Sequence, residues 1–74
     1  MPEEALTAAE IAKNYSAALD SVTVITDLMA LSARDDDQTA TVARNVEHLQ
    51  LMVAKDYWTT EDLAPLNAAI TAGS

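Results

Sequence analysis

The stretch DYWTTEDLAP, residues 56–65, holds the residue types best suited to form a binding site. It contains the only Trp of the chain, Trp58, beside a tyrosine and several carboxylates. An aromatic ring next to carboxylates could act as a ligand platform. The same letters also fit the start of a helix, because Thr59 can serve as an N-cap residue. We favour the second interpretation and predict that Trp58 is a structural anchor between two helices.

Two other features could indicate chemistry. The acids Asp35–Asp37 open the stretch DDDQTATVARNV, but a calcium loop needs Gly and Glu where Ala40 and Val46 stand. His48 is the only histidine, the chain has no Cys, and no Gly-rich phosphate loop is present. One imidazole without a nucleophile or a second ligand is not a catalytic set. We therefore predict no catalytic residue, no metal, no cofactor and no small-molecule substrate, so the protein is not expected to be an enzyme.

The net charge of the chain limits the classes of partner that we expect. Four basic residues against twelve acids give a net charge of −8, which disfavours nucleic acid and anionic membranes. The most apolar window, residues 22–33, is interrupted by Asp27 and is too short to span a bilayer. The N-terminal letters MPEEAL are acidic, unlike the start of a signal peptide. We expect a soluble, cytoplasmic protein.

Seventy-four residues with one Gly and two Pro predict a single helical domain over residues 1–74. Thr7 and Glu10 have the spacing of a capping box, which starts a first helix at about residues 8–33. Its apolar residues recur at spacings of three and four, as on one face of a helix; they are Ile11, Tyr15, Ala18, Val22, Ile25 and Met29.

Two further helices follow. The acids after Arg34 suit the start of a second helix at about residues 36–55, with an apolar stripe of Val42, Val46, Leu49 and Val53. A third helix is expected at about residues 60–72, with Gly73 placed to end it. Thr59 and Asp62 are both possible N-caps, and Pro65 favours Asp62, since a proline is tolerated in a first turn. We expect a tight turn at residues 60–62.

Some apolar residues fall outside these stripes. Val24, Leu28 and Leu31 form a second apolar patch on the first helix, and Leu51 lies opposite the stripe of the second helix. Either the third helix or another chain covers the second patch of the first helix, but the third helix is too short to cover that patch and Leu51 as well. These four residues are therefore a possible interface for another chain, although single exposed leucines are also common on ordinary surfaces.

Two long stretches carry a family resemblance. They are TAAEIAKNYSAALDSVTVI, residues 7–25, and ARNVEHLQLMVAKDYWTTEDLAPLNAAI, residues 43–70. With ARNVEHL and AKDYWTTEDLAP as its most characteristic parts, the chain resembles small uncharacterised proteins of tailed bacteriophages and prophages. The resemblance implies a phage-linked context, such as a virion or assembly component. It supplies no catalytic or binding residues.

Together these features predict an all-α fold, a long antiparallel helical hairpin with a short third helix, as a small three-helix bundle. The expected function is a non-enzymatic structural or protein-interaction module, acting as an oligomer or as an accessory subunit of a larger assembly. The alternative is a small acidic inhibitor or antitoxin-like protein that binds a basic surface of an enzyme. The dispersal of the carboxylates along the helices disfavours mimicry of nucleic acid. The expected partner is a protein, either a second copy or another subunit.

Overall fold

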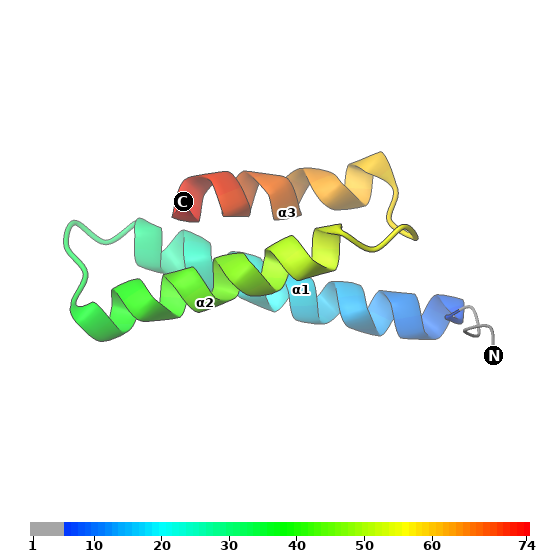
Figure 1. Cartoon of the computed structure of the whole chain (residues 1–74), viewed down its shortest axis with the longest axis horizontal. Coiled ribbons are helices and arrows are strands. Elements are labelled where there is room, and N and C mark those ends of the chain that lie inside the picture. Colours follow the sequence, from blue (N-terminus) through cyan, green and yellow to red (C-terminus); the bar gives the residue numbers. More distant parts are fainter. Residues whose placement is uncertain (1–5) are drawn as a thin grey trace.

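The computed structural model describes residues 6–74, which form three helices: α1 (Ala8–Met29), α2 (Asp36–Val53) and α3 (Thr60–Gly73). Successive helices run in opposite directions along the long axis of the bundle, so that α2 is antiparallel to both α1 and α3 (Figure 1). No strand occurs among the described residues, and the predicted three-helix bundle is confirmed. The acidic residues 1–5, on which the absence of a signal peptide was argued, lie outside the described part of the chain.

A capping box starts each helix. The side chain of the N-cap residue accepts from the backbone N–H three residues on, and the side chain at that position accepts from the N-cap N–H. Two donors that have no partner within the helix are thereby satisfied. The three pairs are Thr7 with Glu10, Asp35 with Gln38, and Thr59 with Asp62.

Thr59, and not Asp62, is the N-cap of α3. The backbone N–H of Asp62 donates to Thr59 Oγ1 at 3.0 Å, and Thr60 is already helical. The predicted turn at residues 60–62 is therefore wrong. Pro65 consequently lies at the sixth position of the helix, where it cannot donate to the carbonyl of Glu61.

The capping box of α1 gives the protein a specific acid dependence. The backbone N–H of Thr7, which donates to the carboxylate of Glu10 at 3.0 Å, is the main cause of a lowered pKa of Glu10, and the Thr7 hydroxyl is the second. The folded pKa thus lies below the unfolded value of about 4.3. Stability from this carboxylate is present above that unfolded value and is lost as pH falls through the folded pKa.

We expect an NMR titration to show a lower Glu10 midpoint in the native chain than in Thr7→Ala. The substitution removes the hydroxyl, which is the second cause of the lowered pKa, and keeps the backbone N–H, so only part of the shift should be lost. The Glu10→Gln variant keeps an acceptor for the capping box but cannot titrate. It should therefore lack this part of the acid dependence of unfolding. Equal midpoints for Glu10 in the native chain and in Thr7→Ala would contradict a contribution of the Thr7 hydroxyl to the lowered pKa.

Two helices end earlier than the sequence predicts, at Met29 and not residue 33, and at Val53 and not residue 55. After α1, the Arg34 guanidinium donates to the carbonyls of Leu28 at 3.2 Å and Leu31 at 3.1 Å. A cation on carbonyls at the C-terminal end of a helix stabilises that end. The chain then reverses before Asp35 starts α2. Helix propensity alone does not predict this chain reversal, because the reversal is imposed by the packing of α2 against α1.

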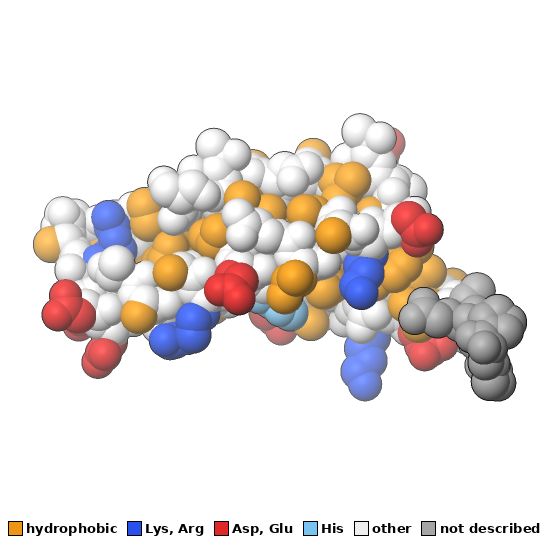
Figure 2. All heavy atoms as spheres, viewed as in Figure 1, with side chains coloured by type: hydrophobic (Ala, Val, Ile, Leu, Met, Phe, Trp, Pro, Cys, Tyr) orange, Lys and Arg blue, Asp and Glu red, His pale blue; other side chains and the backbone are white. Residues whose placement is uncertain are grey.

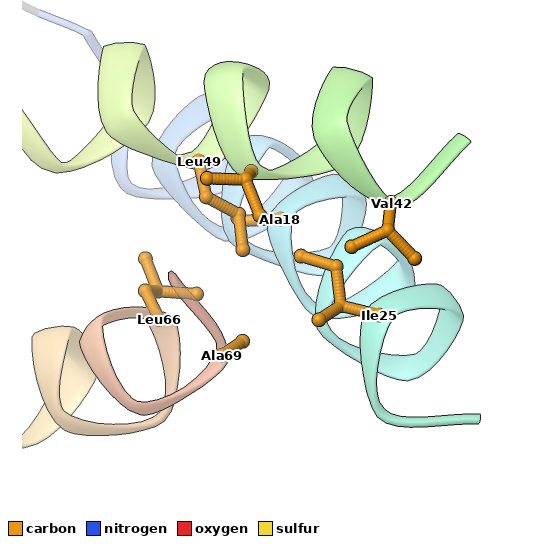
Figure 3. Packing of buried hydrophobic residues seen from close by; sticks show 7 residues of the cluster. Ala18, Ile25, Val42, Leu49, Leu66 and Ala69 are labelled. Carbon is orange, nitrogen blue, oxygen red and sulfur yellow. The ribbon is translucent and has the colours of Figure 1, made fainter. Parts of the chain in front are cut away.

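The core lies where the three helices meet, and each helix contacts the other two. Its side chains come from all three helices and point toward one another (Figure 3). Val42, Val46 and Leu49 of the predicted α2 stripe are all buried. The buried face of α1 is wider than its predicted stripe, since it faces two helices and also takes in Ser21. The core residues are Ala18, Ile25, Val42, Val46, Leu49, Leu66 and Ala69.

Gly73 has a different role from the predicted one. It is the last helical residue of α3, and its φ is not positive, so it does not end the helix in a left-handed conformation. A Cβ at this position would lie 2.6 Å from Cγ2 of Val46 and 3.2 Å from Cγ2 of Ile25. Glycine is therefore used here for close approach of α3 to the other two helices.

We expect Gly73→Ala to lower the free energy of unfolding by about 1–3 kcal/mol, the usual effect of overpacking a core. The methyl of Val46 cannot easily yield, because a β-branched side chain in a helix has one strongly preferred rotamer. Val46→Ala removes the clashing group, so the double variant should be less destabilised than the sum of the two single variants. Denaturant unfolding measures all four proteins, and strict additivity would rule out the close contact.

Candidate interaction surface

The corner between α2 and α3 is built around Trp58. Its side chain is 9% exposed, and its indole N–H donates to the carbonyl of Met52 at 2.7 Å. Its ring lies 5.4 Å from that of Tyr15 and 4.5 Å from that of Tyr57, both at tilted or edge-on angles that aromatic pairs favour. The ring is thus covered by protein and its donor is occupied. These contacts support an anchor and leave no open platform for a ligand.

Residues of α1 complete this corner. The hydroxyl of Tyr15 donates to the carbonyl of Asp62 at 2.9 Å, and Asn14 donates to the hydroxyl of Tyr57 at 3.4 Å. Loss of solvent around Tyr15, and then the negative charge of Asp62, raise the pKa of Tyr15 above its usual value. The corner therefore ties α1 to the beginning of α3 through a specific hydrogen bond. Sequence spacing gave no signal for it, since the two residues are 47 positions apart.

Leu51 is not brought together with the other three predicted interface residues, which lie at or just past the end of α1. Val24 is half-buried, and Leu28 is half-buried against the core, so the patch on α1 is partly covered. Leu31 is 41% exposed but follows the end of α1. Leu51 is 66% exposed near the end of α2, at the opposite end of the bundle from the loop that holds Leu31 (Figure 1). One continuous apolar patch is therefore absent from these positions.

Leu51 belongs to a better-defined surface. We call it the outer face of α2. Its helical members are the exposed residues within an arc of about 80° around the helix, namely Asp36, Ala40, Arg44, Glu47 and Leu51. Lys55, two residues beyond the end of the helix, extends this face. Arg44, Glu47, His48 and Leu51 line a shallow open hollow on it.

Charge is balanced on the outer face of α2. Figure 2 shows acidic, basic and hydrophobic side chains interspersed along α2. The face carries two acids, Asp36 and Glu47, and two bases, Arg44 and Lys55, although the whole chain has net charge −8. The guanidinium of Arg44 donates to Thr41 Oγ1 at 3.1 Å, which holds it along the helix. A face whose charges cancel and which exposes a leucine is suited to contact another protein.

The described chain offers little for other chemistry. Within residues 6–74, no three His, Asp or Glu side chains are grouped so that they could hold a metal ion. His48 is exposed on α2. In the same part of the chain, no helix has both the length and the apolar character needed to cross a membrane.

Comparison of the chain with protein-family models, with curated proteins and with solved structures found no match in any of the three.

Proposed function

We propose that the chain is a non-enzymatic protein-interaction module that acts as an oligomer or as an accessory subunit of a larger assembly. We further propose that it is a soluble cytoplasmic protein, and its resemblance to small phage proteins suggests a virion or its assembly apparatus as that larger structure. The observation that carries the proposal is the exposure of Leu51 on the charge-balanced outer face of α2.

The contrast between two neighbouring leucines gives this observation its weight. Leu49 is fully buried, whereas Leu51, two residues further along the same helix, is 66% exposed. Burying an exposed leucine contributes about 1.5–3 kcal/mol, so a partner that covers Leu51 gains from it. The small size of the chain adds to the argument, because a short domain buries a small share of its own surface. Only three residues of α1, three of α2 and two of α3 are buried, so most of each helix lies at the surface.

In-cell photo-crosslinking tests the proposal. A photo-reactive amino acid is placed at position 51, and in a matched variant at position 19, where Leu19 is 38% exposed on α1. We expect one defined protein adduct from position 51 and none from position 19. Both variants should keep the melting temperature of the native chain. Absence of a defined adduct at position 51 would contradict an interaction through this face.

A further inference from the structure

We propose that the outer face of α2 pairs with the same face of a second copy of the chain, with the two α2 helices antiparallel about a two-fold axis. The inference rests on the proposed function and names the partner. An isologous contact requires that one face be complementary to itself. The sequence of charged and small residues along this face meets that requirement in one register.

The register places the two-fold axis between positions 45 and 46. Arg44 then lies opposite Glu47 of the second copy, and Glu47 lies opposite Arg44 of the second copy. Ala40 lies opposite the second copy's Leu51, where the small side chain leaves room for the leucine. Asp36 lies opposite the second copy's Lys55. Because of the symmetry, each of these contacts is made twice.

The hollow beside Leu51 fits the same arrangement. Arg44 of the second copy would lie over the hollow lined by Arg44, Glu47, His48 and Leu51. Its aliphatic stem would cover Leu51 while its guanidinium reaches Glu47, as long basic side chains commonly do. Antiparallel alignment also sets the helix dipoles of the two copies in opposite directions, which is favourable.

Net charge explains why a second copy would use this face. Two copies of a chain with charge −8 repel each other. The four charges of the outer face of α2 cancel, and they include two of the four basic residues of the whole chain. Exposed ion pairs add little affinity, but they set orientation and register. One helical face is smaller than a standard interface, so we expect a weak dimer with a dissociation constant on the order of micromolar.

Charge reversal tests the register. Sedimentation equilibrium of the purified chain should show a mass rising from 7.9 kDa toward twice that value with concentration. Arg44→Glu or Glu47→Arg alone turns two attractive pairs into two repulsive ones, so each should weaken the dimer by about tenfold or more. The double variant Arg44→Glu/Glu47→Arg re-forms both pairs with exchanged charges. Its dissociation constant should return close to the native value.

A different register would place the two-fold axis at Leu51, and the double variant distinguishes it from the proposed one. With the axis at Leu51, Glu47 faces the second copy's Lys55, so an arginine introduced at position 47 would repel that lysine. The double variant would then still dimerise weakly. A weak double variant, single variants without effect, or a 7.9 kDa monomer at every concentration would each overturn the proposal. A monomer whose position 51 still crosslinks to another protein in the cell would refute the dimer and leave the proposed function standing.

Discussion

We expect Trp58→Ala to lower the free energy of unfolding by about 3 kcal/mol, the lower end of the range for truncation of a large buried aromatic residue. The substitution leaves a cavity against Tyr15 and Tyr57, and it leaves the Met52 carbonyl without its indole donor. For a chain of this size, each kcal/mol shifts the melting temperature by about 4–8 °C. Thermal unfolding followed by circular dichroism should therefore show a fall of more than ten degrees.

Trp58→Phe is the matched variant for this prediction. It keeps an aromatic ring but removes the N–H that donates to Met52 at 2.7 Å. Its free energy of unfolding should lie between those of the native chain and Trp58→Ala, since packing is partly retained. The ligand-platform interpretation predicts instead that Trp58→Ala folds normally and loses a partner. An unchanged melting temperature for Trp58→Ala would therefore favour a binding site over an anchor.

The second large effect is expected from Leu66→Ala. Leu66 is fully buried between α3 and the other two helices, and removal of a leucine side chain from such a site costs about 2–5 kcal/mol. The free energy of unfolding of a native protein is only about 5–15 kcal/mol, so the loss is a large share of it. Urea unfolding should show a lower midpoint with a native-like slope.

Leu51→Ala is the control, because it makes the same chemical change at a residue that is 66% exposed. Measured at a concentration where the chain is monomeric, it should change the free energy of unfolding by less than about 0.5 kcal/mol. Equal costs for the two variants would show that α3 does not pack on the core as described.

Local patterns in the sequence predicted the starts of α1 and α2 and much of the core. Thr7 with Glu10 indicated the start of α1, because a capping box involves residues only three apart. The stripe of Val42, Val46 and Leu49 indicated the buried face of α2, because periodicity is also a local property. Both predictions needed no knowledge of the other helices.

Predictions that depended on contacts between helices were less accurate. The end of α1 at Met29 is set by the chain reversal and by Arg34. The choice between Thr59 and Asp62 as N-cap went against the local preference of Pro65 for a first turn. The tertiary position of α3 gives the reason: helix from Thr60 onward presents the Asp62 carbonyl to Tyr15 at 2.9 Å.

At the candidate interface, too, local periodicity predicted one residue correctly and missed what depends on contacts between helices. Sequence periodicity placed Leu51 opposite the core stripe of α2, and the structure leaves it 66% exposed. Periodicity also grouped Leu28 and Leu31 on one face, whereas the structure packs the first against the core and places the second in a loop.

The sequence by itself determined the all-α class, the capped start of α1 and the main apolar stripes, because each arises from residues within one or two turns of one another. The tertiary structure alone decided where α1 ends and whether Thr59 or Asp62 caps α3. It alone also explains why position 73 is a glycine. Gly73 illustrates the reason most directly: the atoms that exclude a Cβ there belong to Val46, Ile25 and Val42, on two other helices. Contacts between residues far apart in the chain depend on how the helices pack, and the local pattern of residues does not encode that packing.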